Sequence, residues 1–431
     1  MNKTFIERAR NALKILLSRG ALHIVAGTFL TKFVSFFASV FLVRCLSKSD
    51  YGILGYYENF TGYFFLAVGL GLHIGLLRYL VLAESPSLQY GYYRYALKKG
   101  TCWDFLLVFA GMVFCLLYPH PAAFAGHSTL IFLLVIGGLF IFFKHAGLAS
   151  LRALFDHQGY AVLSFITAVL LILMKLAGAY AGGLNGAAAG QLLANIIGGM
   201  ICVYIVKKKF FQDTVPDLID RTAKHEISVY SIQMMLIDGL WAIFMLNDVF
   251  FLGQLCGNEV LVADYKTAYV IPANLSILVS SVGTFVSPYF TKHEHRQDYA
   301  WVQKKFKIML ACTSFIVASA VAACMVLARP LILHLYGERY LSAVPIMRIL
   351  LIASFFNNGI RGPIANVLSA MGKQKYNLLA AGLGIILQVV LDLYCIPRFG
   401  PIGLAWASTA VYLTMATLLF GVFLKYYYKK S

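Results

Sequence analysis

Long apolar segments alternate with short polar ones along the whole chain, and most of the apolar segments are as long as a membrane-spanning helix. A helix that crosses the hydrocarbon core of a bilayer needs roughly 20 apolar residues. The sequence contains about twelve such segments, at 21–43, 56–81, 102–118, 128–150, 160–182, 185–206, 227–255, 263–289, 308–328, 343–370, 376–397 and 401–424. The pattern therefore predicts an all-α polytopic membrane protein.

Composition supports the same fold class. Hydrophobic residues make up 60% of the 431 residues, and charged residues make up only 13%. Soluble domains are nearer to about 45–50% apolar and about 25% charged. The formal net charge of +18 is also found in proteins that bind nucleic acid, so the positions of the charges decide its meaning.

The basic residues gather on one side of the predicted helices. With a cytoplasmic N-terminus, the inner segments hold the basic stretches 1–20, 94–99, 144–152, 207–224, 292–307, 373–375 and 425–430. The outer loops hold only Arg44, Lys48, Lys266, Arg329, Arg339 and Arg398. The positive-inside rule then places both termini in the cytoplasm. The positive charge favours anionic lipid of the inner leaflet as a partner, and we expect no nucleic-acid partner.

The two halves of the chain contain a weak internal repeat. Short matches recur at a nearly constant offset, 214 for Asp50-Tyr51 with Asp264-Tyr265 and 217 for Gly183–Ala188 with Gly400–Ala405. Their constant order indicates duplication of a six-helix unit. Because six spans return the chain to the same side, the two lobes share one orientation and enclose a central cavity at their pseudo-symmetric interface.

This repeat predicts the division of the chain. Residues 1–20 form a basic amphipathic segment that is expected to lie on the inner leaflet. Residues 21–206 form the N-lobe, 207–226 a polar cytoplasmic linker, and 227–431 the C-lobe.

Two opposite charges occupy matching positions of the repeat. At the offset of 217, Lys175 in LILMKLAGAY falls on Asp392 in IILQVVLDLYCIP. Both lie near the outer end of their spans, where a lysine side chain can extend to the interface. The alternative is that both charges face a wet cavity, as an ion pair or as separate site charges.

Polar residues at helical spacing indicate which spans line such a cavity. Four stripes share one helix face each: Thr28, Lys32, Ser35 and Ser39; Asp238, Trp241, Met245 and Asp248; Ser276, Ser280, Thr284 and Ser287; and Ser354, Asn357 and Arg361. Serine and threonine in such stripes also serve helix packing, whereas a charge in mid-membrane usually faces protein or water. We therefore predict a cavity lined by Lys32, Ser35, Asn357 and Arg361. The candidates for an ion or charge relay are Asp238, Asp248, Lys175 and Asp392.

The chemistry of these residues favours an anionic, hydroxylated cargo. Arginine offers a planar fork for phosphate and lysine a compact positive charge. The GIRGP segment, 359–363, is predicted to interrupt its helix. No GxxxxGK[ST] phosphate loop is present, and no metal site or cofactor is indicated. The outer loops are also too short for the acceptor domain of a polysaccharide polymerase or ligase, which counts against an enzyme.

Several segments together resemble a known family. They are DYGILGYYENFTGYFFLAVGLGLHIGLLRYL, LNDVFFLGQLCGNEVLVADYKTAYVIPANLSILVSSVGTFVSPYF, LYGERYLSAVPIMRILLIASFF, NVLSAMGKQKYN and IPRFGPIGLAWASTA. These are similar to the polysaccharide transporter branch of the multidrug/oligosaccharidyl-lipid/polysaccharide (MOP) flippase superfamily, including Wzx-type O-antigen flippases. The resemblance covers nearly the whole chain.

The resemblance implies a flippase rather than an enzyme. It implies that polyprenyl-diphosphate-linked oligosaccharide moves from the inner to the outer leaflet of a bacterial plasma membrane by alternating access. The resemblance also implies that the cavity charges of this chain are Lys32, Arg361 and Arg78. The resemblance also implies a coupling cation, H⁺ or Na⁺, and a polysaccharide polymerase and a chain-length protein as partners.

Two other functions remain open. One is a cation-coupled exporter of drugs or other small molecules, with Asp238, Asp248 or Asp392 as the ion site. The other is a membrane polysaccharide polymerase or ligase.

Overall fold

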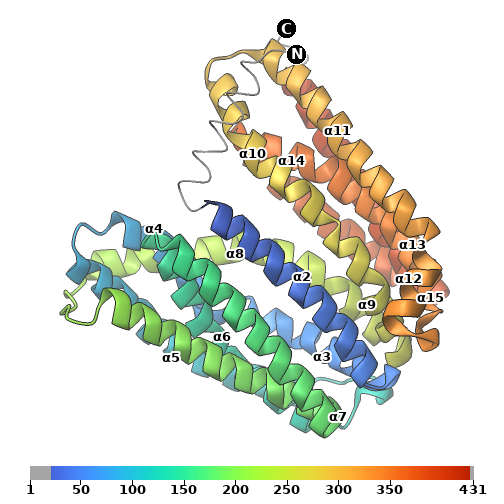
Figure 1. Ribbon diagram of the computed structural model, residues 1–431, viewed down its shortest axis with the longest axis horizontal. Coiled ribbons are helices and arrows are strands. Elements are labelled where there is room, and N and C mark those ends of the chain that lie inside the picture. Colours follow the sequence, from blue (N-terminus) through green and yellow to red (C-terminus); the bar gives the residue numbers. More distant parts are fainter. Residues whose placement is uncertain (1–20, 428–431) are drawn as a thin grey trace. The chain divides into compact units, whose positions relative to one another are not determined.

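The computed structural model describes the backbone of residues 21–427, without the side chains of 21–31, 278, 280–285, 287, 288 and 427 (Figure 1). The predicted segment 1–20 lies outside the described residues, as do the side chains of Thr28, Ser280, Thr284 and Ser287. Within the described part every regular element is helical.

The elements in chain order are α2 (Ala21–Cys45), α3 (Lys48–Phe65), η1 (Val68–Gly71), α4 (Leu72–Leu82), α5 (Pro86–Leu117), η2 (Ala122–Phe124), α6 (Ser128–Ala153), α7 (His157–Phe210), α8 (Arg221–Cys256), α9 (Glu259–Asn274), α10 (Ser276–His295), α11 (Tyr299–Val326), α12 (Ala328–Tyr336), η3 (Glu338–Tyr340), α13 (Ala343–Ser354), η4 (Phe355–Arg361), α14 (Gly362–Ala370) and α15 (Gln374–Tyr427).

The prediction of about twelve spans is confirmed. Helices α2, α5, α6, α8 and α11 each cover one predicted span, and α7 and α15 each cover two. The remaining three spans are broken helices: α3 with α4, α9 with α10, and α13 with η4 and α14. Within the described residues, seven helices are long and apolar enough to cross a membrane, with the bent pair α3–α4 as an eighth. The fold is therefore that of a multi-pass membrane protein.

The two longest helices confirm the internal repeat. Both α7 and α15 contain 54 residues, and each bends at a glycine. Gly183 has φ 58° and ψ −135°, and Gly400 has φ 56° and ψ −139°. These torsions are open to glycine but strained for residues with a Cβ. The duplicated unit has therefore kept both the position and the geometry of this break.

The chain forms two compact units, which share the sequence in an interleaved way. Unit 1 comprises residues 1–46, 61–118 and 127–239, and unit 2 comprises residues 47–60, 119–126 and 240–431. The predicted linker 207–226 and the first part of α8 thus belong to unit 1. Phe211 and Ile219 of the linker are buried in the core of that unit, and Asp217 N–H donates to the Ser87 carbonyl.

The core of unit 1 gathers around Phe142. This α6 side chain is fully buried, and its ring fills the space beside Gly69 and Gly100, where an added Cβ would come within 2.1 and 2.3 Å of it. The core of unit 2 contains the stacked rings of Phe306 and Phe423, 3.6 Å apart at their centroids. Each unit therefore has its own tightly packed apolar interior.

Aspartates cap the helices that follow two of the loops predicted to be cytoplasmic. Asp156 accepts a hydrogen bond from the Gly159 N–H and forms an ion pair with Lys209. Asp298 accepts the Trp301 N–H at 3.1 Å and contacts His293. The Trp301 N–H, and after it His293, stabilise the carboxylate of Asp298 and lower its pKa below the usual value.

The shared break of the repeat gives a stability test. Gly400→Ala places a Cβ on a backbone with positive φ, which costs about 1–3 kcal/mol, so the apparent melting temperature in detergent should fall. Gly382→Ala is the matched control, because Gly382 lies in the same helix with equally open space around it and ordinary helical φ. That control should keep or raise the melting temperature. Equal shifts in the two variants would contradict the assigned strain.

Candidate functional site

A polar cavity of about 300 Å³ lies inside unit 2. Its lining comes from six elements, all of them membrane-spanning or parts of broken spans: α8, α9, α10, α13, η4 and α15. Its walls are Trp241, Met245, Asp248, Tyr269, Pro272, Ala273, Ser276, Leu350, Ala353, Ser354, Asn357, Asn358, Arg361, Ser408 and Tyr412. The walls thus combine one guanidinium, one carboxyl group, two amides and three aromatic rings.

A seven-residue π-helix, η4, places Arg361 in the cavity wall. The sequence predicted an interruption at 359–363, and the structure locates it at 355–361. A π-turn adds a residue to the helical turn and often occurs at functional sites. Ser314 of α11 donates to the Gly359 carbonyl at 3.0 Å, and Ser354 donates to the Pro272 carbonyl at 2.9 Å. These bonds fix the irregular segment from two sides.

Arg361 is held by a hydrogen bond and an aromatic ring. Its Nε donates to Asn357 Oδ1 at 2.7 Å, and its guanidinium carbon lies 4.6 Å from the centroid of the Trp241 ring. Within the described residues no carboxylate forms an ion pair with it. The remaining guanidinium donors can therefore bind an anion or a polar group that enters the cavity.

A network of acids and hydrogen-bond donors adjoins the cavity. Gln388 Nε2 donates to Asp392 Oδ1 at 2.8 Å and to Asp248 Oδ1 at 3.2 Å. The other oxygen of Asp248 accepts Tyr265 at 2.5 Å and Ser408 at 3.3 Å.

Two buried oxygen atoms of this network have no donor. Asp392 and Gln388 are both 0% exposed, and Asp392 Oδ2 and Gln388 Oε1 have no hydrogen-bond partner among the described residues. Buried carboxylates and amide oxygens without donors are ligands of hard cations and acceptors of protons.

A family model for polysaccharide biosynthesis proteins matches residues 17–294, which is more than half of the chain. The chain belongs to this polysaccharide biosynthesis family. A comparison with curated proteins gave no match.

Solved transporter structures share the fold of this polysaccharide biosynthesis protein. The inward-facing conformation of a multidrug resistance MATE family transporter of the MOP superfamily has a TM-score of 0.72 at 16% identity, covering 91% of this chain and 93% of that one. The lipid II flippase MurJ in its inward closed conformation has a TM-score of 0.74 at 15% sequence identity, and the match covers 93% of this chain and 87% of that one. A MOP superfamily transporter from Pyrococcus furiosus has a TM-score of 0.62 at 16% sequence identity, and the match covers 94% of each chain. At these identities the likeness concerns the fold, which is that of MOP superfamily transporters.

The structure brings some of the predicted site residues of this family member together. Arg361, Asn357 and Asp248 line one cavity with Trp241 and Met245. Asp392 joins them through Gln388. The helical spacing of these residues was therefore a sound guide within unit 2.

Other predicted residues lie elsewhere. Lys32 is half-buried and Ser35 exposed on α2 of unit 1. Arg78 is exposed on α4, with its guanidinium 4.8 Å from the Tyr230 ring centroid. Asp238 is exposed and belongs to unit 1, so it does not join the other residues of its stripe in the cavity. Lys175 is half-buried in unit 1, whereas Asp392 belongs to unit 2.

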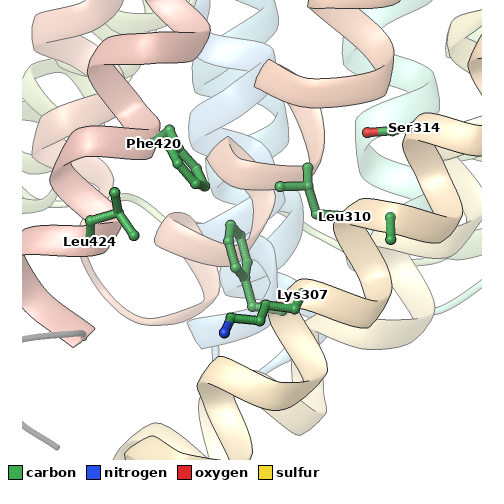
Figure 2. Close-up of a pocket in the computed structure, with 7 residues that line it drawn as sticks. Lys307, Leu310, Ser314, Phe420 and Leu424 are labelled. Atoms are coloured by element: carbon green, nitrogen blue, oxygen red, sulfur yellow. The ribbon is translucent and has the colours of Figure 1, made fainter.

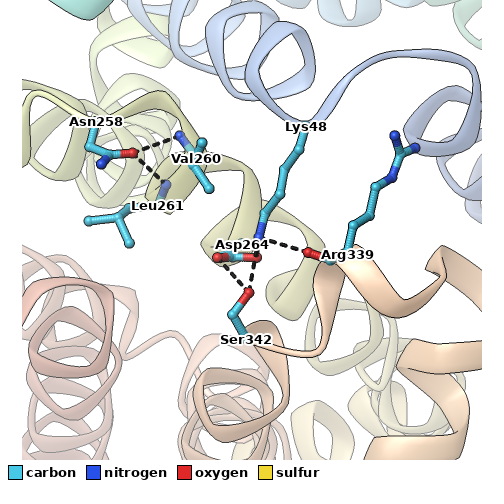
Figure 3. Close-up of polar contacts among 7 residues, drawn as sticks. All are labelled: Lys48, Asn258, Val260, Leu261, Asp264, Arg339 and Ser342. Atoms are coloured by element: carbon cyan, nitrogen blue, oxygen red, sulfur yellow. Dashed lines mark hydrogen bonds and ion pairs between the residues drawn. The ribbon is translucent and has the colours of Figure 1, made fainter.

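An ion pair that the sequence analysis missed fixes the start of α3 within unit 2. Lys48 Nζ lies 2.7 Å from Asp264 Oδ1 and donates to the Arg339 carbonyl and to Ser342 (Figure 3). Ser342 in turn donates to Asp264 Oδ2 at 2.8 Å. The sequence matched Asp264 to Asp50 in the repeat, but a pairing across more than 200 residues leaves no local signal. The pair explains why residues 47–60 cluster with unit 2.

An apolar groove of about 260 Å³ lies on α11 and α15 of the same unit. Figure 2 shows Lys307, Leu310, Ser314, Phe420 and Leu424 around it. Phe306 and Ala311 complete the lining. Such a surface suits hydrocarbon chains, with a lysine at its edge.

The Lys48–Asp264 pair gives a test of stability. Asp264 is 3% exposed, so Lys48→Met leaves a buried carboxyl group short of a donor, at a cost of about 1–3 kcal/mol. The apparent melting temperature should fall. Lys209→Met is the control, because Lys209 is 52% exposed in its pair with Asp156 and surface pairs contribute little. Equal melting temperatures for Lys48→Met and the wild type would contradict the role of the pair.

Proposed function

We propose that this protein is a flippase that moves polyprenyl-diphosphate-linked oligosaccharide, the repeat unit of an O-antigen, capsule or exopolysaccharide, from the inner to the outer leaflet of a bacterial plasma membrane. One observation carries the proposal: a membrane-spanning unit of a polysaccharide biosynthesis protein encloses a polar cavity with an arginine that has no carboxylate partner among the described residues. The fold shared with the lipid II flippase MurJ supports the same class of cargo.

The cavity groups match the head of such a cargo. The guanidinium of Arg361 offers a forked donor for a diphosphate and offsets part of its desolvation cost. The Trp241 ring holds the Arg361 guanidinium in place, and Asn358 and Ser276 are within the lining for hydroxyl groups. A cavity of about 300 Å³ accommodates only part of an oligosaccharide head, so the rest extends beyond it.

Unit 1 contributes the remaining cationic groups in this proposal. Lys32 on α2 and Arg78 on α4 attract the phosphates as the cargo passes from one leaflet to the other by alternating access, and Ser35 on α2 offers a hydroxyl for a hydrogen bond. The prenyl chain stays in lipid throughout, so only the head crosses the apolar layer. Both termini are cytoplasmic, and anionic inner-leaflet lipid, a polymerase and a chain-length protein are the proposed partners.

The acid network is the proposed site of the coupling cation. Gln388 Nε2 donates to both Asp248 and Asp392, and Asp392 Oδ2 and Gln388 Oε1 have no donor among the described residues. A proton or Na⁺ bound there would offset the repulsion between the two carboxylates. Lys175 remains a proposed member of the charge relay.

A cation-coupled exporter of small molecules is the second candidate, because the same acid network serves either cargo. A polymerase or ligase is a third, and it predicts formation of a glycosyl bond by the purified protein. The intermediate that accumulates in a deletion strain separates them: unflipped lipid-linked repeat units indicate the flippase, flipped units that never join indicate a polymerase, and a change in drug resistance alone indicates an exporter.

Loss of the cavity charge should weaken export. We expect Arg361→Ala, and to a smaller degree Lys32→Ala, to cause unflipped lipid-linked repeat units to accumulate while the protein reaches wild-type abundance in the membrane. Arg361→Lys should restore only part of the activity, because lysine keeps the charge but not the fork. Arg348→Ala is the matched control, since Arg348 is exposed on the same broken span. Normal export by both alanine variants would refute the assigned roles.

Removal of one acid should uncouple transport from the ion gradient. Asp392→Asn keeps an acceptor for Gln388 but removes a negative charge, so flipping in proteoliposomes should lose its acceleration by an imposed Na⁺ or proton gradient. Asp238→Asn, an exposed acid of unit 1, should respond to the gradient as the wild type does. Unchanged acceleration in Asp392→Asn would show that the cation binds elsewhere.

A further inference from the structure

The break in the second span of unit 1 has an unusual backbone. The axes of α3 and α4 differ by 51°, and between them Gly69, Leu70 and Gly71 have successive φ values of 60°, 52° and 67°. Leu70 is one of the few described residues with a side chain that adopts positive φ, a conformation that is strained for a residue with a Cβ. Neighbouring groups must therefore stabilise this break.

Two residues of α5 provide that support. Asp104 Oδ1 accepts the Gly69 N–H at 2.7 Å, and the Trp103 indole N–H donates to the Ala67 carbonyl at 2.9 Å. Both bonds satisfy backbone groups that the break takes out of the helical ladder. The break and the acid thus form one structural unit.

The second oxygen of Asp104 has no such partner. Asp104 is 0% exposed, and its Oδ2 has no hydrogen-bond partner among the described residues. The small pocket beside it, about 10 Å³, is otherwise lined by Phe64, Phe65, Val68, Leu107, Val108, Val135 and Gly138. Every one of these neighbours is apolar.

The charged and titratable groups of the surrounding elements lie outside this lining. They are Lys48, Asp50, Tyr51, Tyr56, Tyr57, Glu58 and Tyr63 on α3; His73, Arg78 and Tyr79 on α4; Lys144, His145 and Arg152 on α6; and Tyr90, Tyr92, Tyr93, Arg94, Tyr95, Lys98, Lys99, Cys102 and Cys115 on α5 itself. A carboxylate at Asp104 would therefore be an uncompensated charge within a membrane span, which is strongly unfavourable. The neutral acid needs no cationic partner, so the observed packing suits an acid that holds a proton.

Ionisation would require the pocket to change. After loss of the proton, Asp104 Oδ2 would need a hydrogen-bond donor. A cavity must offer about 10–15 Å³ to admit one water molecule as that donor. The pocket is at the lower edge of that range, and its apolar lining provides no second partner for the water. Release of the proton must therefore widen the pocket or move the Asp104 side chain, and either change disturbs its bond to Gly69.

We propose that Asp104 is a proton-binding site of unit 1, and that release of its proton loosens the break at Gly69–Gly71. An asparagine would accept the Gly69 N–H equally well, so the bond alone does not call for an acid. What the acid adds is exchange of a proton at the one point where the span departs from helical geometry. This site is separate in sequence and in unit from the Asp248–Asp392 network, and its chemistry does not depend on the identity of the cargo.

The purified full-length protein in detergent or nanodiscs allows a direct test. Infrared difference spectra recorded between mildly acidic and alkaline pH should contain the carbonyl band of a protonated carboxyl group that disappears on raising the pH. Asp104→Asn should lose that contribution, and Asp238→Asn should keep it. Should Asp104→Asn fail to fold, Asp104→Glu keeps the acid and should shift the band.

Amide hydrogen exchange reads the structural consequence. The exchange rate is measured for a peptide covering residues 65–75 in the wild type and in Asp104→Asn. The ratio of the wild-type rate to the variant rate cancels the intrinsic effect of pH on exchange. We expect this ratio to rise several-fold as the pH rises. A ratio that stays constant, or an Asp104→Asn spectrum that retains every carboxyl band of the wild type, would overturn the proposal.

A transport measurement separates this proposal from the proposed function. In proteoliposomes made with the Asp392→Asn variant, which lacks the proposed coupling acid, flipping of a fluorescent polyprenyl-diphosphate oligosaccharide should still depend on pH, and adding Asp104→Asn should remove that dependence. Equal pH dependence in both would count against the proton site and leave the flippase intact. Absence of flipping by the wild type, with the infrared and exchange changes present, would instead refute the cargo and leave the proton site standing.

Discussion

Polar groups inside apolar helices must find partners, and this requirement organises both units. A charge or an unpaired backbone group in hydrocarbon costs several kcal/mol, roughly 2.5–3.5 kcal/mol for a side chain on insertion scales. Arg361 meets this requirement with Asn357 and the Trp241 ring. Asp264 meets it with Lys48 and Ser342. Asp104, Gln388 and Asp392 meet it only in part, because each has a buried oxygen without a hydrogen-bond partner among the described residues.

Breaks in the helices provide the sites for this chemistry. Regular helices bond all their own backbone groups, so they offer few donors or acceptors to a ligand. The π-helix η4 places Arg361 in the cavity. In the left-handed segment at Gly69–Gly71, the Gly69 N–H donates a hydrogen bond to Asp104. In the repeat, the breaks at Gly183 and Gly400 have kept one geometry. The other breaks differ between the units: η4 carries Asn357, Asn358 and Arg361, whereas the break at Gly69–Gly71 is apolar and is bonded by Asp104 of α5.

The two units have therefore diverged in chemistry while keeping their helical framework. Unit 2 holds the arginine cavity and the network of Asp248, Gln388 and Asp392. Unit 1 holds a single acid, Asp104, in an otherwise apolar pocket.

The sequence by itself determined the membrane class, the positions of the twelve spans and the duplication, because hydrophobic length and repeated segments are local properties of the chain. Helical spacing also placed Asn357 with Arg361, and Asp248 with Trp241 and Met245, since residues one turn apart share a helix face. Only the tertiary structure decided that Lys48 pairs with Asp264, that residues 47–60 cluster with unit 2, and that Asp104 supports the break at Gly69. Those contacts join residues far apart in the sequence, and a lone acid near the predicted start of a span has no periodic partner to reveal its burial. Packing between distant segments, rather than spacing within one, sets the surroundings of each charge.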